Sequence, residues 1–258
     1  MTIPSTDLED FRELVRRGHL EDWPYRLLPL GNYSCRMPSI LAKGRYSPGM
    51  DFGRPLETLT PTLDGDVLAV LARADAEMTG RQIQRLAGHG SHQGIRNAAD
   101  RLTQQGIVLR RGAGNANLYK LNRDHVAAPW VEGLAGLSEQ VLERLRNTIG
   151  TWAQPPVLAV LFGSVATGHA TPTSDLDLLI VRPAGCDPDE PTWRAQISSL
   201  EEQATTWTGN DTRIIEYDQQ TLPEKESEPL LRDVLRDGIE IHGSLRTLRR
   251  LTRAGSSQ

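Results

Sequence analysis

Apolar positions recur with helical spacing over much of the first half of the chain. Between residues 62 and 106, three segments place aliphatic side chains three or four residues apart on one face. The pattern predicts three short helices, with Thr79 and Ser91 as the N-caps of the second and third. Residues 7–17 show the same spacing and predict a further amphipathic helix.

A β-hairpin is predicted directly after these helices. Two apolar runs, 107–111 and 118–121, flank a turn rich in glycine and asparagine. Three short helices and a hairpin are the element order of a winged helix-turn-helix domain. The stretch 68–121 resembles winged helix domains of the MarR/ArsR-like kind. That fold binds DNA in some proteins and mediates protein–protein contacts in others.

In a winged helix that binds DNA, the third helix enters the major groove and the hairpin touches the neighbouring backbone. The first residues of that helix then come within reach of base edges, and the wing lies near phosphates. On this basis the predicted contacts to an operator DNA are made by Ser91, His92, Gln93, Arg96, Arg110 and Arg111.

The segment 123–150 predicts a connector followed by one amphipathic helix. Leu137, Val141, Leu145 and Ile149 fall on one face of it. That face packs on its own chain, or between domains, or between protomers, so a homodimer is one expectation.

Strand patterns dominate the last hundred residues. Apolar runs at 157–162 and 176–181 predict buried strands, and residues 210–218 and 237–243 predict two more. Helical spacing appears at 191–207 and 229–238. The predicted fold class is α+β: a winged helix-turn-helix domain followed by a small mixed sheet with helices on one side.

Chemistry concentrates at the ends of the first two of these strands. Gly163 and Ser164 follow the first strand, and Asp175 and Asp177 begin the second. Side chains alternate along a strand, so the two aspartates share a face and can hold a divalent metal ion. A glycine turn into a helix brings backbone N–H groups close to phosphate oxygens.

These residues resemble the signature of the minimal nucleotidyltransferases, within the DNA polymerase β-like superfamily. The resemblance covers roughly residues 150–243 and rests on Gly163-Ser164, ten intervening residues, and Asp175-Leu-Asp177. It implies that Gly163 and Ser164 hold a nucleoside triphosphate such as ATP. It also implies that Asp175 and Asp177 bind Mg²⁺ or Mn²⁺ for catalysis.

Many members of this family carry a third carboxylate on a later strand. The matching place here holds Arg213, so Glu216 is our substitute as metal ligand or general base, with Asp211 as the alternative. A site without any third carboxylate stays open as well. Arg182 is assigned to the nucleotide, where its charge would neutralise phosphate.

The resemblance leads to two hypotheses for function. The first is a Mg²⁺-dependent enzyme that transfers AMP from ATP to a protein or RNA acceptor, joined to a DNA-binding winged helix. Antitoxins that modify a toxin protein fit this arrangement. The second is a transcription regulator whose transferase fold binds a nucleotide effector without turnover.

Charge and composition bear on the number of modules, on disulfide bonds and on the cellular location. Residues 61–122 carry eight basic and five acidic groups, whereas residues 151–243 carry six basic and sixteen acidic ones. This asymmetry indicates two modules with different partners. Two distant cysteines argue against a disulfide scaffold, and the absence of a signal peptide or long apolar run predicts a cytoplasmic protein without membrane contact.

The predicted organisation therefore has five parts. They are an N-terminal extension at 1–60, the winged helix-turn-helix domain at 61–122, the connecting helix at 123–150, the nucleotidyltransferase domain at 151–243, and a disordered basic tail at 244–258.

Overall fold

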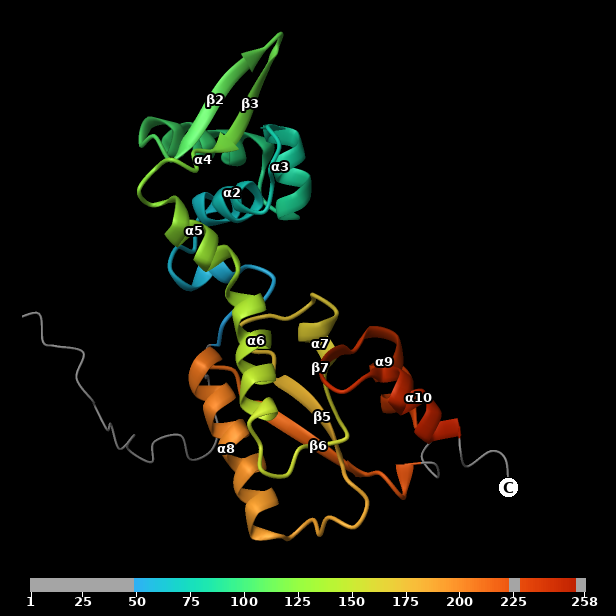
Figure 1. Ribbon diagram of the computed structural model, residues 1–258. Helices are drawn as coiled ribbons and strands as arrows, with labels where there is room; N and C mark the ends of the chain where they lie inside the picture. Colours follow the sequence, from blue (N-terminus) through green and yellow to red (C-terminus); the bar gives the residue numbers. More distant parts are fainter. Residues whose placement is uncertain (1–48, 223–227, 254–258) are drawn as a thin grey trace, which may run out of the picture. The chain divides into compact units, whose positions relative to one another are not determined.

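The computed structural model describes residues 49–222 and 228–253 (Figure 1). The predicted helix at 7–17 lies outside these residues. Among the described residues, no helix is both long enough and apolar enough to cross a bilayer.

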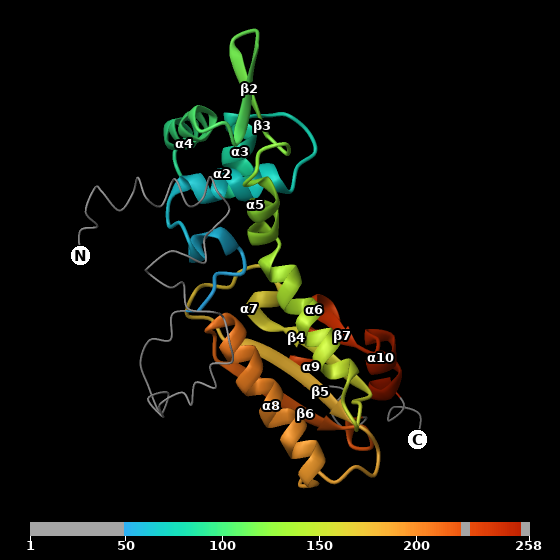
Figure 2. The ribbon, with the colours of Figure 1, turned by 60° about the vertical axis from the view of Figure 1, so that its left-hand side comes forward.

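Three helices and a small sheet form around one apolar core in the first part of the described chain. The helices are α2 (Leu63–Ala72), α3 (Gly80–Ala87) and α4 (His92–Gln104). The sheet is antiparallel in the order β1-β3-β2, from β1 (Met78–Thr79), β2 (Val108–Ala113) and β3 (Ala116–Leu121). Figure 2 shows the β2–β3 hairpin projecting beyond the helices.

The helix ends in this part follow their local sequence. Thr79 caps α3 in a capping box with Gln82, and Gly88 ends that helix in the left-handed region at φ 75°. The Ser91 side chain accepts a hydrogen bond from the Gly94 N–H and so caps α4. Both caps agree with the sequence prediction.

Two helices occupy the segment for which one was predicted. They are α5 (Ala128–Ala135) and α6 (Leu137–Gly150), with Gly136 between them. Ala128 and Val131 of α5 are buried in the core of α2–α4. The apolar face of α6 is instead buried with the second sheet, so this helix packs on its own chain.

The second sheet has four strands in the order β6-β5-β4-β7. Strand β5 runs parallel to β6, while β4 is antiparallel to both β5 and β7, which makes the sheet mixed. The strands are β4 (Leu158–Phe162), β5 (Leu176–Arg182), β6 (Thr212–Asp218) and β7 (Ile239–His242).

Helices cover both faces of this sheet, which corrects the prediction of helices on one side. One face packs against α6 and α8 (Pro191–Thr208). The other face packs against α9 (Pro229–Asp237) and α10 (Leu245–Arg253), as the two views in Figures 1 and 2 agree. Leu158 and Leu179 turn to the second face, and Leu161 and Leu178 turn to the first.

Helix α10 lies within the predicted disordered tail, so that prediction is wrong for residues 245–253. Leu248 is fully buried against the sheet, and Thr252 is buried as well. The prediction of disorder rested on the arginines of this segment. The leucines at 245, 248 and 251 supply the apolar face of the helix.

The segment before α2 also belongs to the core of the second sheet. Met50 and Phe52 are buried with residues of α6 and α8. The chain then continues through the short 3₁₀ helix η3 (Pro55–Thr58) into α2. Residues on either side of α2–α5 thus complete one apolar core.

Candidate active site

The Gly163 turn and the Asp177 carboxylate are in direct contact. Gly163 follows β4 and opens the short helix α7 (Gly163–Ala166) with φ 75°, a left-handed conformation that L side chains rarely adopt. A Cβ atom on Gly163 would lie only 2.7 Å from Asp177 Oδ2. The position therefore requires glycine for two separate reasons, its backbone conformation and the carboxylate beside it.

Asp177 lies on β5 opposite Phe162 of β4, which explains why its side chain meets the following glycine. Burial raises the pKa of the Asp177 carboxyl, the negative charge of Asp175 raises it further, and Arg213 opposes both. The folded chain thus disfavours the ionised form of Asp177, as expected for a carboxylate positioned for a cation.

Arg213 forms an ion pair with Asp175. Its Nη1 lies 2.7 Å from Asp175 Oδ2, and Arg213 is the register partner of Asp177 on the parallel strand β6. In the sequence, Arg213 occupies the place of the usual third carboxylate, and this pair was not predicted. The register of two strands separated by helix α8 is not visible in local spacing.

Glu216 does not lie with the two aspartates. It is three residues beyond Arg213 on β6, and an odd separation places it on the opposite face of the sheet. There its carboxylate accepts a hydrogen bond from Trp193 Nε1 at 2.7 Å and pairs with Arg194 at 2.6 Å. The structure therefore gives no support to Glu216 as a ligand of the same metal.

Arg182 is likewise distant from the aspartate pair. It ends β5, five residues from Asp177 or about 16 Å along the strand. Its guanidinium is buried, donates to the Cys186 carbonyl and pairs with Asp218 at 3.1 Å. This arrangement joins strand ends and does not bring Arg182 to the Gly163 turn.

The residues at the turn suit one divalent cation bound together with a ligand. Asp175 and Asp177 supply hard oxygen atoms, and Mg²⁺ commonly takes one or two carboxylates plus phosphate oxygens. Among the described residues, no group of three or more His, Cys, Asp or Glu side chains could hold a metal ion. Within this part of the chain the site thus offers two acids, Asp175 and Asp177, without a third carboxylate beside them.

A buried asparagine fixes the loop that leads into Asp175. Asn210 is almost fully buried and donates from Nδ2 to the Ser174 carbonyl at 2.9 Å. Its Oδ1 accepts from the Met50 N–H at 3.0 Å. One side chain therefore connects the segment before α2 with the residue preceding Asp175, and no sequence pattern signalled this role.

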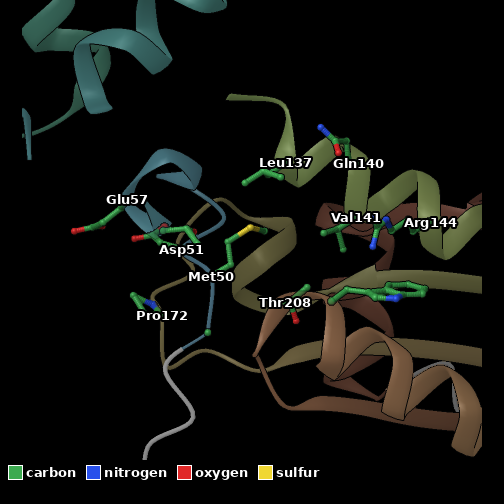
Figure 3. Close-up of a pocket in the computed structure, with 12 residues that line it drawn as sticks. Met50, Asp51, Glu57, Leu137, Gln140, Val141, Arg144, Pro172 and Thr208 are labelled. Carbon is green, nitrogen blue, oxygen red and sulfur yellow. The ribbon is translucent and has the colours of Figure 1, made fainter. Parts of the chain in front are cut away.

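A pocket of about 500 Å³ adjoins the contact between Asn210 and Met50, but neither Asp175 nor Asp177 lines it. Figure 3 shows Asp51 and Glu57 on one side of it, and Gln140 and Arg144 of α6 on another. The Arg144 guanidinium lies 5.7 Å from the centre of the Trp207 ring, which gives this wall a cation–π contact. The pocket marks where residues 49–58 pack against α6 and the end of α8.

The six residues predicted to contact DNA differ in what they contact in the structure. His92 and Arg96 of α4 border the same cleft as Asn115 and Asn117 of the hairpin. Arg110 pairs with Asp100 at 3.2 Å, and Arg111 pairs with Glu77. Ser91 caps α4, and Gln93 donates to the Asn97 side chain.

One family model matches residues in the second part of the chain. Residues 140–241 match the family model of the nucleotidyltransferase domain, which confirms the expected nucleotidyltransferase. No curated protein matches the chain.

Two solved structures are similar over 45% of this chain and 84% of theirs. One is a toxin–antitoxin with AMP-PNP (16% identity, TM-score 0.33), and the other is a mutant of the toxin–antitoxin MntA-HpeT (14% identity, TM-score 0.33).

Proposed function

We propose that the nucleotidyltransferase domain moves a nucleotidyl group, AMP from ATP, to a macromolecular acceptor. The observation that carries this proposal is the contact between the left-handed Gly163 turn and the Asp177 carboxylate. The Gly163 turn can approach triphosphate oxygens. The Asp177 carboxylate beside it can bind the metal ion that those oxygens also bind.

In this proposal each residue has a distinct task. The backbone N–H groups after Gly163 and the Ser164 hydroxyl bind triphosphate oxygens. Asp175 and Asp177 hold Mg²⁺ or Mn²⁺, which when bound neutralises charge on the phosphates and the leaving pyrophosphate. Gly163 is exposed, so an acceptor hydroxyl can reach a triphosphate bound at the turn, attack the α-phosphorus and displace pyrophosphate.

A labelling experiment tests the activity. The purified chain is incubated with α-labelled ATP, Mg²⁺ and host lysate, beside Asp177→Asn. Asp233→Asn is a matched control, because Asp233 is an exposed acid of α9 paired with Arg236. Label on a macromolecule with the unaltered chain and Asp233→Asn, but not with Asp177→Asn, is the expected result. Equal labelling by Asp177→Asn would remove the site assignment.

The acceptor is proposed to be a protein partner, in the manner of an antitoxin that modifies its toxin. The same labelled sample distinguishes this from an RNA acceptor. Protease treatment should release the label from large species, and ribonuclease should leave it in place. The opposite pattern would make RNA the acceptor. Competition by unlabelled CTP, GTP and UTP measures the choice of nucleotide.

Residues 61–122 are proposed to be a winged helix that binds DNA. Helices α2, α3 and α4 followed by the hairpin support this, as do His92, Arg96, Asn115 and Asn117, which line the cleft between α4 and the wing. The ion pairs of Arg110 and Arg111 are exposed, so phosphates can replace their partners at little cost.

Operator binding by an Arg96→Ala, Arg111→Ala double variant tests this part. Fluorescence anisotropy should show weaker binding, on the order of tenfold or more, and a flatter dependence on salt. Arg101→Ala is the control, because Arg101 lies at the far end of the same helix and pairs with Asp64. Equal affinity of the double variant and the unaltered chain would refute DNA binding.

One observation favours a second function, a regulator that binds nucleotide without transfer. Asp175 is already paired with Arg213, and no third acid joins it among the described residues. No label in any sample, together with measurable ATP binding, would favour this function over the enzyme.

A further inference from the structure

Arg213 stands where its charge opposes the expected cation. It is the register partner of Asp177, and its guanidinium lies 2.7 Å from Asp175. Two carboxylates and one guanidinium leave this cluster with a net charge near −1, whereas an acid at position 213 would make it near −3.

We propose that Arg213 acts as an internal cation that holds Asp175 until nucleotide arrives, so that a divalent ion binds only by displacing it. The inference rests on the proposed function, because both use Asp175 and Asp177. It makes Arg213 a residue that determines how metal and nucleotide bind, not a catalytic residue.

The geometry allows this exchange. The Arg213 side chain is 67% exposed, so its guanidinium can rotate away from Asp175 without opening the core. A triphosphate at the Gly163 turn would offer phosphate oxygens both to the metal ion and to the released guanidinium. Metal and nucleotide should therefore bind with positive coupling, and metal alone should bind weakly.

Mn²⁺ binding to the full chain, measured by electron paramagnetic resonance without nucleotide, tests the proposal. Arg213→Gln should tighten Mn²⁺ binding by roughly tenfold or more, since a neighbouring opposite charge alters ionic equilibria by about that much. Arg213→Lys, which keeps the charge, should bind within about twofold of the unaltered chain. Adding AMP-PNP should tighten Mn²⁺ binding more in the unaltered chain than in Arg213→Gln.

Arg194→Gln is the matched control. Arg194 is another partly exposed arginine paired with an acid of β6, but on the opposite face of the sheet. It should leave Mn²⁺ affinity unchanged, and Asp177→Asn added to Arg213→Gln should abolish the gain. Equal affinity of Arg213→Gln and the unaltered chain overturns the proposal, as does an equal gain in Arg194→Gln.

The test separates the inference from the proposed function. A gain in Mn²⁺ affinity without any nucleotidyl transfer would support the role of Arg213 and refute the enzyme. Transfer that depends on Asp177, with Mn²⁺ affinity indifferent to Arg213, would support the enzyme and refute this role.

Discussion

Substitutions of two left-handed glycines, Gly163 and Gly168, separate the effect of backbone strain from the effect of contact with Asp177. Gly163→Ala should destabilise the fold by about 1–2 kcal/mol through its left-handed backbone and should also displace Asp177. Gly168→Ala is the control, because Gly168 has φ 73° but open space around its Cβ position. Melting temperatures should fall for both variants, while Mn²⁺ binding in the presence of AMP-PNP should be lost only in Gly163→Ala. Retained binding there would contradict the close contact.

The raised pKa of Asp177 predicts that the free energy of unfolding depends on pH. Because burial raises its pKa in the folded state, the stability linked to its protonation is present below the unfolded pKa and is lost as pH rises through the folded pKa. Asp177→Asn should therefore raise the melting temperature of the metal-free protein at pH 7.

Melting curves at pH 7 and near pH 4 check this prediction. The advantage of Asp177→Asn should shrink at the lower pH, because more of the Asp177 carboxylate is protonated there. With Mg²⁺ and AMP-PNP the order should reverse, because only the unaltered chain gains the binding energy of the ligands. A variant less stable than the unaltered chain at pH 7 would show that the carboxylate stabilises the fold.

The individual site residues were predictable only where they are close in sequence. Gly163, Asp175 and Asp177 follow from strand alternation and a glycine turn. Arg213 and Glu216 lie on a strand whose register and facing depend on the packing of α8, so the choice between them was not visible in the sequence. Asn210 acts through backbone groups of distant residues and carries no motif.

At the scale of elements, α10 gives the sharpest prediction. Leu248→Ala should destabilise the transferase domain by about 2–5 kcal/mol, because it removes a fully buried side chain between α10 and the sheet. Arg250→Ala, on the exposed side of the helix, should stay within about 0.5 kcal/mol. Thermal unfolding of both variants is the measurement, and an unchanged Leu248→Ala would mean that the helix contributes nothing.

Elements were predicted well wherever apolar spacing was dense and caps were present, as in α3, α4 and the two central strands. The errors have physical causes. Gly136 divides the connecting segment into α5 and α6, and their apolar faces enter different cores. Helices on both faces of the sheet follow from β4 and β5 being apolar on both sides, since all five residues of β4 are buried.

At the scale of the molecule, the described residues form three apolar clusters, one within α2–α5 and one on each face of the second sheet, and the cluster beneath α6 and α8 is assembled from separated segments. A fragment of residues 61–135 contains the whole core of α2–α5 and should unfold cooperatively. A fragment of residues 151–243 lacks Met50, Phe52, α6 and Leu248, so it should show no cooperative transition. Circular dichroism on heating measures both. Cooperative unfolding of the shorter transferase fragment would show that these residues are dispensable.

The burial of Met50 in the transferase core has a consequence for synthesis on the ribosome. Residue 50 is translated before α2, but its hydrogen-bond partner Asn210 follows 160 residues later. At about 5–20 residues per second, roughly 8–32 s pass between them. During that interval the α2–α5 unit can fold alone, while an unpaired apolar segment waits at its N-terminal end. The segment that carries Met50 is thus open to chaperones for most of that interval, and it joins the second sheet only after residue 210 has been made.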